Sequence, residues 1–146
     1  MSTIRNEEIP DLLAVSRNMH FNIYRDYRNG FIICESCSEY APIDDFKETF
    51  ESMVPVILEH GIGKFIFDKR AMRAFHQPTM EWYFVIWKRK LLEIGLNTHR
   101  KILPEEAWFQ KCVEAGRATI LAENPDFRID LLDIKYFDSI SDCIRN

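Results

Sequence analysis

Residues 21–37, FNIYRDYRNGFIICESC, decide how the fold begins. Phe21 and Ile23 alternate with polar residues, which is typical of a strand with one buried face. The pair Asn29-Gly30 separates this run from a second apolar run, and both turn residues tolerate a positive φ. The segment therefore predicts two antiparallel strands joined by a turn.

The rest of the chain alternates helix and strand patterns. Apolar residues from Ile43 to Leu58 recur at spacings of three and four, which predicts a helix with one buried face. The run Phe65-Ile66-Phe67 predicts a short buried strand. The same signals predict, in order, a helix over 78–94, a strand over 99–103, a helix from Pro104, a strand over 129–137 and a short helix from Ser139.

This order of elements predicts βαβ crossovers. We therefore expect an α/β protein with a mixed, mostly parallel sheet, an N-terminal antiparallel hairpin and helices packed on the sheet. At 146 residues the chain fits one domain, expected over residues 20–146, with an N-terminal arm over residues 1–19. Within that arm, Asp11–Arg17 is expected to be a short helix or a loose segment. The inner face of the helix after Pro104 is expected to hold Trp108, Cys112, Ala115 and Thr119.

Composition excludes several classes of protein. The net charge is −4, which argues against general nucleic-acid binding. No apolar run approaches the length of a membrane span, and residues 1–10 are polar and lack the apolar segment of a secretory signal. The four cysteines are expected to be free thiols in a cytoplasmic protein.

The charge is unevenly distributed. Between Lys64 and Lys101 there are nine Lys or Arg residues and only three Asp or Glu residues, whereas the flanking segments are acidic. A basic middle of the chain favours an anionic ligand or an acidic partner, and it is also compatible with charges placed on the surface for solubility.

Several features together resemble one family. They are the opening hairpin, the strand end Phe65-Ile66-Phe67-Asp68, an aromatic helix around Trp82 and Trp87, and Phe137-Asp138-Ser139 at the entry to the last helix. They resemble the STAS fold of anti-sigma-factor antagonists, the SpoIIAA-like family, in a branch of small bacterial proteins. The resemblance covers about residues 20–145, and it implies a regulatory module that acts by binding a protein partner.

The phosphorylation motif of those antagonists is absent. In that family an Asp-Ser-x-Gly sequence opens a helix, and a partner kinase phosphorylates the serine. The matching place here reads Gln77-Pro78-Thr79-Met80, with Thr79 as the only nearby hydroxyl. This departure puts a phosphorylation switch in doubt.

A first candidate site follows the central strand. Ligands of open α/β sheets bind at the carboxyl ends of the strands, and the start of the next helix adds free amides and a positive dipole. The ligand-binding candidates in this loop and helix start are Asp68, Lys69, Arg70, Arg73, His76 and Thr79. The alternative interpretation is that Asp68 pairs with Arg70 and that the other side chains are solvated.

The helix over 78–94 carries more aromatic residues than one face buries. Trp82 and Trp87 are candidates for an apolar ligand pocket or for a homodimer interface. A second basic patch is expected from Lys88-Arg89-Lys90 and His99-Arg100-Lys101, for an acidic partner or a lipid headgroup, unless these cations only complement a helix end.

Cys34 and Cys37 have the CxxC spacing, but a predicted strand places them on opposite faces, which suits neither a zinc site nor a redox turn. No other motif of nucleophilic catalysis, of metal binding or of nucleotide binding occurs. We therefore expect a non-enzymatic regulatory or interaction module without a metal or a cofactor. The alternative is a small-molecule or lipid-binding protein that uses the aromatic helix and the adjacent basic residues.

Overall fold

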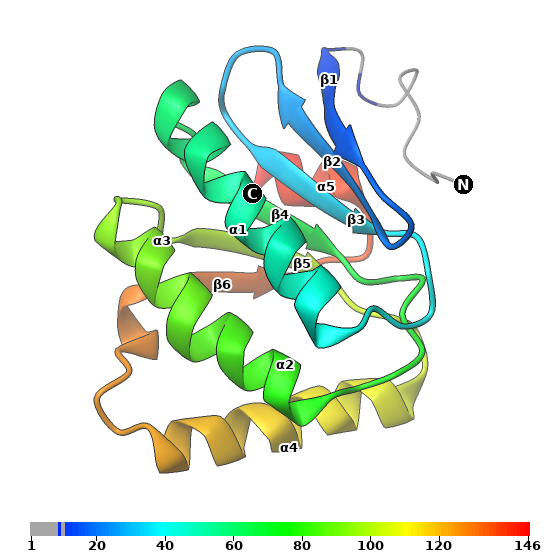
Figure 1. The fold of residues 1–146 in the computed structure, drawn as a ribbon, viewed down its shortest axis with the longest axis vertical. Coiled ribbons are helices and arrows are strands. Elements are labelled where there is room, and N and C mark those ends of the chain that lie inside the picture. Colours follow the sequence, from blue (N-terminus) through cyan, green and yellow to red (C-terminus); the bar gives the residue numbers. More distant parts are fainter. Residues whose placement is uncertain (1–8, 10) are drawn as a thin grey trace.

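A computed structural model describes residue 9 and residues 11–146. These residues form one six-stranded sheet in the order β1-β2-β3-β4-β5-β6 (Figure 1). The strands β1 (Leu12–Arg17), β2 (Phe21–Asp26) and β3 (Ile32–Ser36) are antiparallel, and β3, β4 (Lys64–Asp68), β5 (Thr98–Ile102) and β6 (Asp133–Tyr136) are parallel. The expected α/β class, with a mixed sheet and an antiparallel hairpin, is confirmed.

Helices make the three crossovers between the parallel strands. The first is α1 (Ile43–His60), the second is a continuous helical stretch of α2 (Gln77–Glu81), the π-helix η1 (Trp82–Lys88) and α3 (Arg89–Glu93), and the third is α4 (Ala107–Glu123) with the 3-10 turn η2 (Ile129–Leu131). A last helix, α5 (Ile140–Arg145), follows β6, and Ser139 Oγ caps it by accepting the N–H of Asp142, as the sequence predicts.

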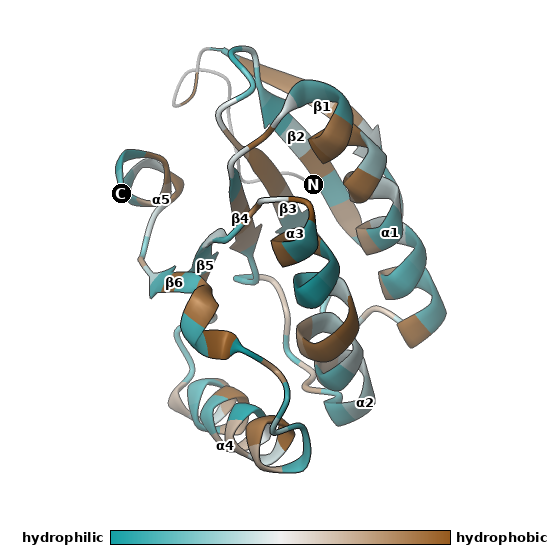
Figure 2. Ribbon diagram, turned by 90° about the vertical axis from the view of Figure 1, so that its left-hand side faces the viewer, coloured by the Kyte–Doolittle hydropathy of each residue, from teal (hydrophilic) through white to brown (hydrophobic). Residues whose placement is uncertain are grey.

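The helices divide the core into two layers. Each crossover moves one strand further in the same direction, so crossovers of one hand bring their helices to the same face of the sheet. Figure 2 shows α5 on the opposite face from α1 and α3. Along β4 the side chains alternate accordingly: Phe65 and Phe67 belong to the cluster under the crossover helices, and Ile66 belongs to the cluster under α5.

The first turn is longer than the dipeptide alone suggests. Residues 27–31 separate β2 from β3, and the N–H of Asp26 donates to the carbonyl of Phe31 at 2.9 Å. Asn29 takes a φ of 61°, and its neighbour Gly30 donates its N–H to Asp26 Oδ2 at 3.1 Å. Asn29 therefore supplies the left-handed residue of this turn.

The structure corrects the expectation for the segment before β2. The sequence analysis expects a short helix or a loose segment at Asp11–Arg17, but Leu12–Arg17 form β1, which pairs with β2 along its length. Only Leu12 of this strand is buried, so the strand has no alternation that a sequence pattern would reveal. The earlier part of the expected N-terminal arm, residues 1–8 and 10, lies outside the described residues.

The structure also corrects the expected inner face of α4. The expected residues, among them Trp108 and Thr119, are mostly exposed, and Trp108 is 48% exposed. The buried residues lie one position later: Phe109, Val113, Gly116 and Ile120. Both series have helical spacing, so periodicity alone does not choose between them.

No helix within the described part of the chain has both the length and the apolar character needed to cross a membrane.

Candidate functional site

Three lysines converge between the sheet and the crossover helices. Lys69 directly follows β4, and its N–H donates to the carbonyl of Ile102 at 2.8 Å. Lys88 is the last residue of η1, and Lys101 lies in β5 beside Phe67 of β4. The exposed fractions are 6% for Lys69 and 0% for Lys88 and Lys101. We call these three residues the lysine cluster.

The ring of Tyr83 is the centre of the lysine cluster. Its centroid lies 5.4 Å from Lys69 Nζ, 4.8 Å from Lys88 Nζ and 5.0 Å from Lys101 Nζ. Two of the amines also lie over Phe84, at 4.2 Å for Lys88 and 4.5 Å for Lys101. Aromatic faces attract cations, so contact with the rings partly compensates for the hydration that the amines lose on burial.

The π-helix explains how Lys88 reaches Tyr83. In an α-helix, residues five apart point in directions about 140° apart, because each residue turns the helix by about 100°. In a π-helix the hydrogen bonds join residues i and i+5, so each turn holds more residues and side chains five apart point in more similar directions than in an α-helix. Tyr83 and Lys88 are five apart, and η1 brings them to the same side.

The lysine cluster has no anionic counterpart among the described residues. Among the described residues, Lys88 Nζ and Lys101 Nζ have no hydrogen-bond partner except each other. Lys69 contacts the rings of Phe67 and Tyr83 and forms no ion pair with a described residue. Burial of one unpaired cation costs several kcal/mol of folding free energy, so three buried together destabilise this part of the fold.

Burial also changes the protonation of the lysine cluster. Burial, with a smaller contribution from Arg117, lowers the pKa of Lys69 to about 8. Burial also lowers the pKa values of Lys88 and Lys101 well below the ordinary lysine value, and the positive charge of nearby Lys69 lowers both further. Without a ligand, the lysine cluster therefore holds fewer protons than three exposed lysines do.

Two more polar groups beside the lysine cluster lack partners. The hydroxyl of Tyr83 is buried without a hydrogen bond among the described residues, and burial raises its pKa, so it stays a phenol. Both ring nitrogens of His99 are likewise buried and unpartnered, and burial, followed by the charges of Lys88 and Lys101, lowers the pKa of this imidazole. Native cores satisfy most such groups, so this concentration marks a candidate site.

Two cavities flank the lysine cluster. The first has a volume of about 50 Å³ and is lined mainly by aromatic and aliphatic side chains together with Lys69, His76, Thr79 and Tyr83. The second has a volume of about 300 Å³ and a polar lining that includes Arg117 and Tyr136. Val113 of α4 lines both, and Lys101 Nζ lies near rings from both, Tyr83 at 5.0 Å and Tyr136 at 5.9 Å.

Three of the predicted site residues bind one another at the edge of this region. Arg70 donates from Nε to Asp68 Oδ1 at 3.0 Å and from Nη2 to Asp68 Oδ2 at 2.7 Å, so the Asp68–Arg70 pair that the sequence offers as an alternative is present. Arg73 donates to the carbonyls of Arg70 and Met72, and its Nε lies 3.2 Å from Glu106 Oε1. None of Asp68, Arg70 and Arg73 lines either cavity.

His76 and Thr79 form the start of α2 and line the first cavity with Lys69. His76 Nδ1 accepts the N–H of Thr79 at 3.4 Å and lies 2.7 Å from Thr79 Oγ1. Thr79 is buried, at 8% exposure. The structure therefore brings together three of the predicted residues, Lys69, His76 and Thr79, at one cavity.

The two tryptophans lie elsewhere. Trp87 is completely buried, and its Nε1 donates to the carbonyl of Phe50 at 2.7 Å. Trp82 is half-buried beside Phe46, with Lys47 Nζ 5.8 Å from its ring. Neither tryptophan lines the first or the second cavity, so they do not form the predicted pocket there.

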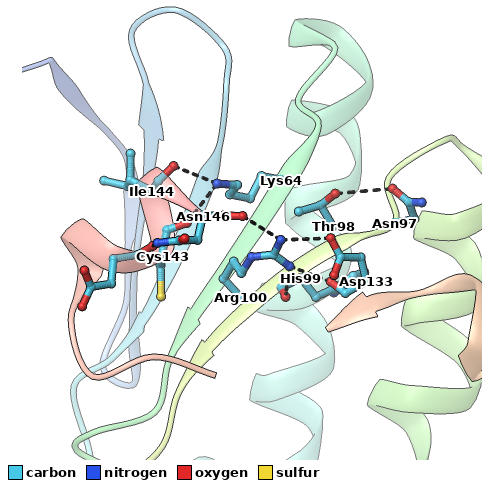
Figure 3. Close-up of polar contacts among 10 residues, drawn as sticks. Lys64, Asn97, Thr98, His99, Arg100, Asp133, Cys143, Ile144 and Asn146 are labelled. Carbon is cyan, nitrogen blue, oxygen red and sulfur yellow. Dashed lines mark hydrogen bonds and ion pairs between the residues drawn. The ribbon is translucent and has the colours of Figure 1, made fainter. Parts of the chain in front are cut away.

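The opposite face of β5 also buries a cation, but with acceptors (Figure 3). Arg100 donates to Asp133 Oδ2 at 2.9 Å and to the carbonyl of Asn146 at 2.8 Å. Lys64 donates to the carbonyls of Cys143 and Ile144 at 2.9 Å and 2.8 Å, at the carboxyl end of α5. Cations are stabilised at that end of a helix, so this arrangement has a structural explanation that the lysine cluster lacks.

The sequence analysis missed Lys88 and Lys101, which it placed in a surface patch. For Lys101, the sequence of β5 contains a usable signal. In THRKI, His99 and Lys101 point to one face of the strand, and Arg100 and Ile102 point to the other. A central strand is buried on both faces, so one of these faces has to bury a lysine. For Lys88 the signal depends on the π-helix, which an α-helical period hides.

Comparison of the chain with family models, with curated proteins and with solved structures found no match. Among the described residues, no group of three or more His, Cys, Asp or Glu side chains is placed to hold a metal ion.

Proposed function

We propose that this protein binds a small anionic molecule between the sheet and α4, at the lysine cluster. One observation carries the proposal: three lysine amines lie within 5.4 Å of the centre of the Tyr83 ring, buried and without an acidic partner among the described residues. A phosphate or a carboxylate in the first cavity would supply the missing charge, and it would accept a hydrogen bond from Lys69, the member of the lysine cluster that lines this cavity.

The size of the cavities limits the ligand. The first cavity, at about 50 Å³, has space for about four water molecules, since one needs roughly 10–15 Å³ on the same measure. A short acid fits this space better than an acyl chain does. The polar second cavity is larger and adds Arg117 as a further cation.

Binding of inorganic phosphate and of short carboxylates is the test. We expect these anions, at millimolar concentration and constant ionic strength, to raise the melting temperature, because a ligand that binds only the native state adds RT ln(1 + [L]/Kd) to its stability. Native mass spectrometry of the freshly purified protein would show a bound small mass if the natural ligand is retained. The absence of both effects would overturn the proposal.

Two lysines near the end of the second crossover provide matched variants. Lys88→Met removes a buried amine of the lysine cluster, whereas Lys90→Met removes an exposed one two residues later. We expect Lys88→Met to abolish the melting shift that phosphate causes and Lys90→Met to retain it. Equal loss in both variants would indicate a general electrostatic effect instead of a site.

The second candidate function is a STAS-like, non-enzymatic interaction module in the cytoplasm, which binds a protein partner or forms a homodimer. Its support is the hairpin followed by three crossovers with their helices on one face of the sheet. A monomer or dimer without a bound small mass, together with no response to anions, would favour this candidate.

A phosphorylation switch at Thr79 has little support within this second candidate. Its hydroxyl lies 2.7 Å from His76 Nδ1, and the residue is buried at the start of α2. A kinase would have to open that helix start to reach it. We therefore expect Thr79→Ala to leave partner binding unchanged.

A further inference from the structure

We propose that Lys69 forms a reversible imine with a short α-keto acid or aldehyde acid held in the first cavity. This inference rests on the proposed anion binding and adds the chemical class of the ligand. It turns on the position of one amine: of the lysine cluster, only Lys69 lines a cavity, so only its Nζ is reachable by a small molecule there.

The surroundings of Lys69 favour a nucleophilic amine. A lysine acts as a nucleophile when it is neutral, and burial beside other cations keeps it so. Lys69 Nζ lies 4.9 Å from the ring centre of Phe67 and 5.4 Å from that of Tyr83, and no carboxylate pairs with it among the described residues. The pKa of about 8 leaves about half of the amine neutral at pH 8.

The neighbours of Lys69 suit a carbonyl compound that also carries a negative charge. Lys88 and Lys101 lie around the same Tyr83 ring without lining the cavity, so their positive charge would attract a carboxylate there without touching it. The buried Tyr83 hydroxyl stays protonated and has no acceptor, so it is free to donate a hydrogen bond to the carbonyl oxygen. A neutral aldehyde would use only part of this arrangement.

The step needs no oxidant or reductant. The lone pair of the neutral Lys69 Nζ attacks the carbonyl carbon, the electrons of the C=O double bond move to oxygen, and one proton passes from nitrogen to that oxygen. The resulting carbinolamine then loses its hydroxyl group together with the second nitrogen proton as one molecule of water, while nitrogen forms the C=N bond. The products are an imine and water, and hydrolysis reverses the reaction.

Reductive trapping of the intact protein tests this proposal. The protein is incubated at pH 8 with pyruvate and sodium cyanoborohydride, and the modified lysines are mapped by digestion and mass spectrometry. We expect about tenfold or more label on Lys69 than on the exposed Lys111 of α4, because an ordinary lysine is almost fully protonated at this pH. Equal labelling of both lysines, or none, would overturn the proposal.

Variants refine the same experiment. Lys69→Arg keeps a cation but cannot form an imine, so label at this position disappears, while Lys111→Arg leaves the label on Lys69 intact. Lys101→Met should reduce labelling by pyruvate more than labelling by neutral propanal, because only pyruvate needs the second cation. If Lys69→Arg does not fold, the peptide map of the wild-type protein decides alone.

Lactate separates this inference from the proposed function, since it has the charge of pyruvate but no carbonyl group. A melting shift with lactate and no trapped adduct with pyruvate would overturn the imine and leave anion binding standing. No shift with lactate or phosphate, and no adduct, would overturn both. A shift with lactate together with an adduct on Lys69 would support both.

Discussion

The amines of Lys88 and Lys101 lie over the same aromatic ring, that of Phe84, at 4.2 Å and 4.5 Å from its centre. One comes from the crossover helix and the other from a central strand, so the two charges meet only in the folded protein. Two like charges in so dry a place repel each other and oppose folding. The following expectations about stability and binding derive from this relationship and from the features that surround it.

Replacement of Lys101 by Met should stabilise the ligand-free protein. Methionine is similar in length to lysine, and the change removes a buried amine whose hydrogen-bond partner among the described residues is another amine, that of Lys88. We expect the free energy of unfolding to rise by about 1–3 kcal/mol in urea titrations, while binding of phosphate is lost. The exposed control Lys90→Met should stay within about 0.5 kcal/mol of the wild type. A less stable Lys101→Met would mean that the amine is stabilised in the native state.

Stability should keep rising with pH above neutrality, whereas most proteins are most stable between about pH 5 and 8. The folded pKa of Lys69, about 8, lies below the unfolded value of 10.5, so between these values the unfolded chain binds more protons and stability rises with pH. This amine alone contributes about 3 kcal/mol across that window. Burial lowers the pKa values of Lys88 and Lys101 as well, so both act in the same sense.

The lowered pKa of His99 acts in the same sense as the lysines below pH 6.5. The rise ends at high pH, because burial raises the pKa values of Tyr83, Cys34 and Cys143, and stability falls where these groups ionise only in the unfolded chain. Urea titrations at intervals from pH 6 to 10.5 should therefore place the maximum near pH 9.5–10. A maximum near neutrality would contradict the assigned protonation.

The titratable groups around Lys69 are Tyr83 and Lys88 of η1, His99 and Lys101 of β5, Arg117 of α4, Tyr136 of β6 and His76 before α2.

Gly116→Ala should disturb the first cavity. A Cβ atom at this position of α4 would collide with Phe75 Cζ and lie 2.7 Å from Gln77 Oε1 and 3.2 Å from Met80 Sδ. We expect a loss of about 1–3 kcal/mol of stability and weaker anion binding, because Phe75 and Met80 line the cavity. Thr119→Ala, at an exposed position of the same helix, serves as the control. Unchanged binding in Gly116→Ala would mean that the ligand does not enter between α2 and α4.

Lys64→Met should loosen α5. It removes the donor to the carbonyls of Cys143 and Ile144, and we expect a loss of about 1–2 kcal/mol of stability. The Cys143 thiol, which is completely buried, provides a local readout: its reaction with a thiol reagent should become faster. Lys135→Met, at an exposed position of β6, should leave that rate unchanged. Equal rates in both variants would show that other contacts hold α5.

Much of the fold was predictable, because local chemistry and tertiary structure agree there. The alternation around Phe21, the apolar stripe of Ile43–His60 and the cap at Ser139 all correspond to what forms. The face of α4 was not predictable, since Trp108 and Phe109 begin two equally regular stripes and only the close approach of Gly116 to Phe75 favours one.

The candidate site was predictable only in part. Lys69, His76 and Thr79 follow from the rule that ligands bind near strand ends, and the structure brings them to one cavity. Lys88 could not be found from an α-helical period, because the π-helix turns it onto Tyr83. Basic residues also favour the surface on average, so a sequence pattern gives no reason to bury one without an acceptor.

Arg100 and Lys101 are neighbours in β5 that bury one cation on each face of the sheet, and only the terminal nitrogens of Arg100 have acceptors. Substitutions at these two adjacent positions should therefore change the stability of the fold in opposite directions. A change at codon 100 removes the donor to the Asp133 carboxylate and to the Asn146 carbonyl, so we expect it to weaken the fold whether or not a ligand is bound. A change of codon 101 to an aliphatic residue should strengthen the fold, so we expect lysine to be retained there only where selection maintains the proposed ligand site.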